Sequence, residues 1–124
     1  MSKFSKHDDV INSYEVIERI EELREELDGE PTPASRDELN AELRALEKLD
    51  SDGRNVSEDW EYGETLVNDD YFVTYAQEFA EEIGAVESDA SWPTYYIDWD
   101  RAARDLQMDY SPIEFDGQTF WVRA

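Results

Sequence analysis

The sequence predicts an α+β fold, in which an N-terminal antiparallel helical hairpin is followed by a small domain of two helices packed on a C-terminal β-hairpin. Three observations support this prediction. Two apolar stripes at helical spacing precede residue 50, the aromatic residues concentrate after residue 56, and an Asp-Gly turn lies near the end of the chain. The 124 residues suffice for one domain, or for a small domain with an appendage. Residues 1–9 are polar and are expected to form a flexible tail.

Residues 10–52 have the pattern of an acidic helical hairpin. Apolar residues recur there at spacings of three and four, the period of a helix with one apolar face. These residues are Val16, Ile20, Leu23, Leu27, Leu39, Leu43, Leu46 and Leu49. Asn12 and Ser35 occupy capping positions, and Gly29 and Asp52-Gly53 are the expected helix ends. The hairpin is either a simple two-helix coiled coil or an arm for dimerisation or partner binding.

Residues 56–124 carry most of the large rings. Fourteen of the sixteen aromatic residues lie between Trp60 and Trp121. Aromatic side chains bury the most apolar area per residue, so the main core is expected in this part of the chain. We therefore expect residues 56–124 to fold without residues 1–50.

Local signals predict the elements of this second unit. A helical stripe, capped by Asn68 or Asp69, consists of Phe72, Tyr75, Ala76, Phe79, Ala80 and Ile83. Asp98 is the expected cap of a shorter helix. Asp116-Gly117 predicts a two-residue type I′ turn between two strands. Because a two-stranded ribbon is marginal alone, Glu64–Val67 is a candidate third strand.

The charge balance excludes several classes of partner. The chain has 33 acidic residues against 11 lysines and arginines, a formal charge of −22. Phosphates and anionic headgroups repel such a protein, so direct binding to nucleic acid or to a membrane is not expected. The N-terminus has no apolar signal region, and no run of residues is apolar enough to span a bilayer. A cytoplasmic protein is expected, in the host cytoplasm if a phage encodes it.

The sequence offers little for catalysis. It has no cysteine, and its single histidine, His7, lies in the predicted tail. Thiol catalysis, a Ser-His-Asp triad and a metal centre held by Cys or His are therefore not expected. Paired carboxylates are abundant, but they fall at helix caps and polar helix faces rather than in a predicted cleft. We expect a protein that is no enzyme and has no catalytic residue, metal site or cofactor.

An acidic stretch runs from Asn55 to Asp100. It contains thirteen acids and ten aromatic residues, but no Lys, Arg or His. A disordered acidic tail would lack the aromatic residues, so the stretch predicts a folded surface with unneutralised charge. Such a surface suits a basic partner, a cation or a salty environment.

The interpretation that we favour is mimicry of DNA. Duplex DNA carries one charge per about 1.7 Å of axis, and acids at positions i and i+4 of a helix are about 6 Å apart along it. Rigid acidic helices can therefore approach the charge density of phosphates. The candidate partner-binding acids are Glu58, Asp59, Glu61, Glu64, Asp69, Asp70, Glu78, Glu81, Glu82, Glu87, Asp89 and Asp100.

Two segments carry a resemblance to a known family. Tyr75-Ala-Gln-Glu-Phe-Ala-Glu-Glu-Ile-Gly84 and Tyr96-Ile-Asp-Trp-Asp-Arg-Ala-Ala-Arg-Asp-Leu106 resemble the antirestriction protein ArdA and related phage proteins, over about residues 56–124. In that family an acidic helix precedes an IDW…ARDL helix and a closing hairpin. The resemblance implies an elongated acidic DNA mimic that mobile elements use against type I restriction–modification enzymes. The expected partner is thus the basic DNA-binding channel of a bacterial defence complex, either such an enzyme or a CRISPR effector.

Two alternatives remain open from the sequence. A halophilic protein carries many acids and few lysines, as this chain does with three lysines, and its acids serve solubility. An adaptor could instead use residues 10–50 to form a homodimer. A halophilic protein unfolds in low salt, whereas a mimic stays folded there.

Overall fold

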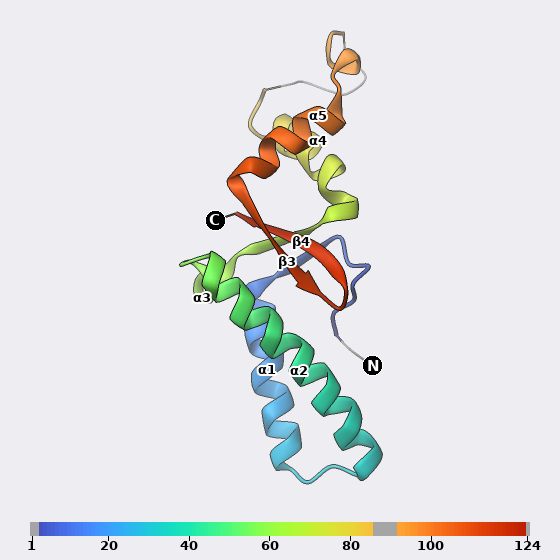
Figure 1. The fold of residues 1–124 in the computed structure, drawn as a ribbon, viewed down its shortest axis with the longest axis vertical. Helices are drawn as coiled ribbons and strands as arrows, with labels where there is room; N and C mark the ends of the chain where they lie inside the picture. Colours follow the sequence, from blue (N-terminus) through green and yellow to red (C-terminus); the bar gives the residue numbers. More distant parts are fainter. Residues whose placement is uncertain (1–2, 86–91, 124) are drawn as a thin grey trace.

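The computed structural model describes residues 3–85 and 92–123 and has the expected α+β architecture in an elongated molecule (Figure 1). A helical hairpin lies at one end, a four-stranded sheet in the middle and a second pair of helices at the other end. The helices are α1 (Ser13–Asp28), α2 (Pro33–Val56), α3 (Trp60–Gly63), α4 (Phe72–Glu82) and α5 (Trp99–Leu106). The strands are β1 (Val10–Asn12), β2 (Thr65–Asn68), β3 (Tyr110–Phe115) and β4 (Gln118–Arg123).

The sheet separates two clusters of buried side chains. Its strands are antiparallel and follow the order β1-β2-β4-β3. Leu66 pairs with Val122 and Val67 pairs with Trp121. Because successive side chains of a strand point to opposite faces, Leu66 and Val122 pack towards the helical hairpin, whereas Val67 and Trp121 pack towards α4 and α5.

The larger cluster joins the helical hairpin to the sheet. Its fully buried members come from α1, α2, α3 and the strands and include Val16, Leu23, Leu46, Leu49, Trp60, Leu66, Phe120 and Val122. The apolar stripes of α1 and α2 are therefore buried within the same chain. The two segments that the sequence divides at about residue 56 share one core.

Helix α1 matches its prediction, but both ends of α2 differ. The Thr32 hydroxyl, not that of Ser35, caps α2 by accepting the Ser35 N–H at 3.3 Å. This places Pro33 at the first helical position, where its missing N–H costs nothing. The helix then continues past Asp52-Gly53 to Val56. Gly53 lies inside the helix instead of ending it, and its lack of a Cβ leaves room for the ring of Trp60.

The N-terminal segment packs against the sheet, where the sequence predicts a flexible tail. Phe4 is buried in the larger cluster. The side-chain amide of Asn68 donates to the carbonyls of Lys6 at 2.9 Å and Asp8 at 3.0 Å, and its backbone N–H donates to the Asp9 carbonyl at 2.9 Å. These bonds lead directly into β1.

The predicted cap of α4 is wrong, because Asn68 accepts the Asp70 N–H at 2.9 Å at the start of the 3-10 turn Asp69–Tyr71, and α4 itself has no side-chain cap. The other local predictions are confirmed. Asp98 caps α5 by accepting the Arg101 N–H at 3.2 Å. Asp116 and Gly117 have φ of 53° and 81°, as a type I′ turn requires. Strand β2 supplies the third strand expected at 64–67.

The predicted apolar stripe of α4 is only partly buried. Phe72 and Ala76 lie in the smaller cluster, whereas Phe79 is half-buried and Ile83 is 61 % exposed. The reason is that the C-terminal end of α4 lies beyond the sheet (Figure 1).

Candidate partner-binding surface

The predicted acids form two groups on the described part of the chain. One group surrounds α3 and consists of Glu58, Asp59, Glu61 and Glu64. The other runs from the 3-10 turn Asp69–Tyr71 along α4 and consists of Asp69, Asp70, Glu78, Glu81 and Glu82. All of these except the half-buried Glu64 are exposed. Asp100 is exposed on α5, while Glu87 and Asp89 lie outside the described residues.

The group around α3 is partly neutralised. Arg54, near the end of α2, forms ion pairs with Glu61 and Asp50. Hydrogen bonds to Asp50 and Glu61 raise the pKa of Arg54, which therefore stays charged. The Glu64 carboxylate accepts the Ser57 hydroxyl at 2.8 Å. These two glutamates are thus tied to neighbours, whereas Glu58 and Asp59 form no ion pair with a described residue.

No acid of the group along α4 forms an ion pair with a described residue. Neutral donors hold two of its five carboxylates in place instead. The indole N–H of Trp121 donates to Asp69 at 2.9 Å, and the Tyr71 hydroxyl donates to both oxygens of Glu78 at 2.8 and 2.9 Å. The hydrogen bond to Glu78 raises the pKa of the Tyr71 hydroxyl, which therefore remains a donor. These contacts orient the acids without removing their charge.

A tyrosine pair supports α4 from within. The hydroxyls of Tyr75 and Tyr110 lie 3.0 Å apart, and both rings contact Phe72. Burial, followed by the hydrogen bond with Tyr75, raises the pKa of the Tyr110 hydroxyl. The helix that carries Glu78, Glu81 and Glu82 is therefore anchored by a neutral aromatic cluster.

The helical hairpin contributes acids that the predicted list omits. Helix α1 carries seven, and they are Glu15, Glu18, Glu21, Glu22, Glu25, Glu26 and Asp28. All are exposed. The 16 residues of α1 span about 24 Å at 1.5 Å per residue, so these acids recur about every 3.4 Å. Phosphates recur every 3.4 Å along one DNA strand. The high acid content of the helix is visible in the sequence, but Arg19 and Arg24 interrupt it, so it is not a stretch free of basic residues.

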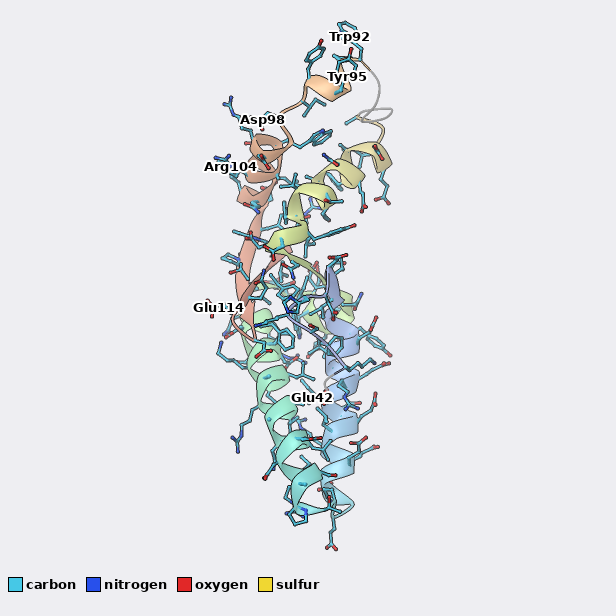
Figure 2. The ribbon with its side chains drawn as sticks, turned by 90° about the vertical axis from the view of Figure 1, so that its right-hand side faces the viewer. Glu42, Trp92, Tyr95, Asp98, Arg104 and Glu114 are labelled. Carbon is cyan, nitrogen blue, oxygen red and sulfur yellow. The ribbon has the colours of Figure 1, made fainter. Side chains whose placement is uncertain are left out.

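Ion pairs between described residues concentrate in and next to the hairpin. Arg19 bridges α1 to Glu42 of α2 at 2.8 Å and also reaches Glu22 at 3.3 Å, and Arg24 pairs with Glu47 at 2.9 Å. Figure 2 shows Glu42 within the hairpin, far from Asp98 and Arg104 on α5. The charge of the hairpin is thus partly balanced, and that of the α4 group is not.

Metal binding and membrane crossing were the two other kinds of site to consider among the described residues. They contain no group of three or more Asp, Glu, His or Cys side chains placed to hold a metal ion. Within the same residues, no helix combines the length and apolar character needed to cross a membrane. The distinctive feature of the described residues is negative charge displayed on rigid helices.

Comparison with known families decides the relationship. The family model described as "Antirestriction protein (ArdA)" matches residues 3–119. The chain belongs to the ArdA antirestriction family. Neither the curated proteins nor the solved structures contain a significant match to it.

The ArdA match is longer than the resemblance seen in the sequence. The sequence suggests a resemblance over about residues 56–124, with the helical hairpin outside it. The predicted family is confirmed, and the match extends the resemblance, because it begins at residue 3 and includes the whole hairpin. ArdA proteins are a family of inhibitors, and membership implies antirestriction, the inhibition of type I restriction–modification enzymes.

Proposed function

We propose that this protein inhibits a type I restriction–modification enzyme by occupying its DNA-binding channel with an acidic surface that imitates the phosphate backbone. The observation that carries the proposal is the α4 group. It displays Asp69, Asp70, Glu78, Glu81 and Glu82 with no ion pair to a described basic residue. A solvated helix face ordinarily mixes both signs of charge.

The spacing of the acids supports imitation of a strand. On α4, Glu78, Glu81 and Glu82 occupy positions i, i+3 and i+4, which bring carboxylates together on one side of the helix. On α1 the acids recur at about the phosphate interval of one DNA strand. The two helices lie on opposite sides of the sheet along the long axis (Figure 1). An extended basic channel would therefore meet acids along much of the molecule.

The energetics would follow those of DNA. A dense row of carboxylates collects counterions, and a basic channel that replaces them releases those ions. Affinity would then fall steeply as the salt concentration rises. The Tyr71 and Trp121 hydrogen bonds support the proposal because they fix Glu78 and Asp69 before binding, which lowers the entropy cost of association.

The channel of a CRISPR effector presents similar basic chemistry and stays a second candidate target. Family membership favours the type I enzyme, in the bacterial cytoplasm where that enzyme meets DNA. The adaptor alternative loses support, because Leu23, Leu46 and Leu49 of the hairpin stripes are fully buried in the chain's own core. A homodimer would have to use another surface.

The proposal predicts that the α4 acids act together, through their combined electric field. Replacing Glu78, Glu81 and Glu82 together by Gln should weaken binding to a purified type I enzyme several-fold and reduce the slope of log Kd against log salt by up to about three. The matched control removes the same charge from β3 and the turns that flank it, with Asp109→Asn, Glu114→Gln and Asp116→Asn. It should change both the affinity and the salt slope less. Unchanged affinity and slope in the α4 variant would exclude α4 from the surface.

The halophilic alternative is tested with the same protein. A thermal melt followed by circular dichroism in buffer with minimal salt should show a cooperative transition. Unfolding at low salt would favour the halophilic interpretation, in which the acids serve solubility.

A further inference from the structure

Three aromatic side chains are exposed at the end of the molecule opposite the helical hairpin. Trp92, Tyr95 and Tyr96 are 72 %, 54 % and 73 % exposed. Figure 2 shows Trp92 and Tyr95 projecting from this end, beyond α5. We call these three residues the aromatic tip. Large rings usually contribute to a core, so three exposed rings within five residues need an explanation.

Two rings of the aromatic tip contact each other. The ring centroids of Tyr95 and Tyr96 lie 4.6 Å apart with an interplanar angle of 44°. Other exposed large apolar side chains, such as Tyr62 on α3 and Met108 after α5, lie singly in other parts of the fold. Single exposed residues of that kind are ordinary.

Carboxylates flank the aromatic tip. Asp98 and Asp100 follow it directly and are exposed, and the chain has no Lys, Arg or His from Asn55 to Asp100. The exposed Arg101 and Arg104 come next, on α5. The arginines of a channel for duplex DNA bind carboxylates as they bind phosphates, and a guanidinium group also stacks on the face of an exposed aromatic ring. Exposed rings beside carboxylates therefore offer such a channel two kinds of contact.

We propose that the aromatic tip enters the DNA-binding channel of the inhibited enzyme, where its rings stack on guanidinium groups of the channel while the neighbouring acids take the place of phosphates. This inference rests on the proposed function and adds a non-ionic contact to it. A second copy of the chain is the less suitable occupant, because it would bring two tips with the same carboxylates together.

The inference predicts a division of labour that salt can reveal. Contacts made by rings release no counterions, so their loss should lower affinity without changing the salt dependence. Loss of α4 carboxylates should change the salt dependence itself. The two kinds of variant are therefore distinguishable in one titration series.

The test uses the full chain and a purified type I restriction–modification enzyme that the parent protein inhibits. Trp92→Ala, Tyr95→Ala and Tyr96→Ala combined should weaken binding about tenfold or more, since each stacked ring contributes substantially. The slope of log Kd against log salt should stay that of the parent. Replacing all three by Phe should restore affinity to within about twofold, because the rings remain. The control variant Met108→Ala removes an exposed apolar side chain elsewhere and should bind like the parent.

Several results would overturn the inference. Parental affinity in the Ala variant would exclude the tip from the contact, and a changed salt slope would show that the tip acts only through the acids. Sedimentation velocity tests the other occupant: a parental dimer that the Ala variant converts to a monomer would make the tip a self-association surface. If the Ala variant does not fold, Trp92→Ala alone, at the most isolated ring, should still lower affinity. If the parent protein neither binds nor inhibits any type I enzyme, the proposed function is wrong. If the parent and the Ala variant inhibit equally well, only this inference is wrong.

Discussion

At the scale of single residues, Gly53 is the clearest case in which packing overrides local propensity. Gly inside a helix costs about 1 kcal/mol relative to Ala, yet α2 carries it without ending. The ring of Trp60, which is buried and donates its indole N–H to Asp50 at 2.7 Å, occupies the space that a Cβ would need. Gly53→Ala should therefore destabilise the protein by about 2–3 kcal/mol, typical of an overpacked core, as measured by urea unfolding. Gly29→Ala is the control, because a Cβ there meets only ordinary contacts, and its effect should stay within about 0.5 kcal/mol. A stabilised Gly53→Ala variant would contradict the packing of Trp60 against α2.

Glu42 is a second residue whose surroundings predict a measurable effect. Its side chain is 8 % exposed and pairs with the 15 % exposed Arg19, and the Lys3 N–H also donates to it. Burial alone would raise the pKa of Glu42, but the bonds from Arg19 and Lys3 and the charge of Arg19 lower it below its usual value of 4.5. A lowered folded pKa gives stability that is present above about pH 4.5 and disappears as the pH falls through the folded pKa.

Glu42→Gln should accordingly reduce stability near neutral pH by about 2 kcal/mol, less than for a fully buried pair because Arg19 keeps Glu22. The difference from the parent should shrink as the pH falls below 4.5, because protonation removes the charge of Glu42. Glu47→Gln, in the exposed pair with Arg24, should cost at most about 0.5 kcal/mol. Denaturant unfolding of all three proteins across this pH range is the measurement. A constant difference between Glu42→Gln and the parent would show that the ion pair does not link pH to stability.

At the scale of elements, local signals predicted most helices and the terminal hairpin, because caps, apolar stripes and Asp116-Gly117 act through near neighbours in the chain. The elements that depend on distant partners were not predictable in this way. Strand β1 has three residues, too few for a pattern, and it forms because Ile11 pairs with Leu66. The extension of α2 depends on a ring seven positions beyond Gly53. The acids of the 55–100 stretch in the candidate surface could be listed from the sequence. Only the fold shows that Arg54 pairs with Glu61 and that the α1 acids lie along the same elongated body.

The shared core leads to a prediction about the elements in isolation. The aromatic content favours independent folding of residues 56–124, but the structure gives the opposite expectation. Removing residues 1–50 would remove β1 and uncover Leu66, Phe120 and Val122, all fully buried against the hairpin. A fragment of residues 56–124 should therefore show no cooperative thermal transition by circular dichroism. Addition of a separate 1–55 fragment should restore one if the core is the cause. A cooperative melt of the 56–124 fragment alone would show that the α4–α5 cluster suffices.

At the scale of the whole molecule, the long axis orders the features that the proposed function needs. Helix α1 with its seven acids occupies one end, the unneutralised α4 group lies beyond the sheet, and the aromatic tip ends the other side (Figure 1, Figure 2). The two buried clusters hold these parts in one body. Rigidity matters because a mimic that must be ordered on binding loses affinity. Occupation of the DNA-binding channel by one rigid surface therefore implies competition with DNA.

Competition with duplex DNA tests this claim most directly. A purified type I restriction–modification enzyme is titrated with this protein at several fixed concentrations of duplex DNA that contains the recognition site of the enzyme. The account predicts that the apparent Kd of the protein rises in proportion to the DNA concentration, with no ternary complex in sedimentation velocity. An apparent Kd that does not change with DNA, together with a complex that contains enzyme, DNA and this protein at once, would contradict occupation of the DNA-binding channel.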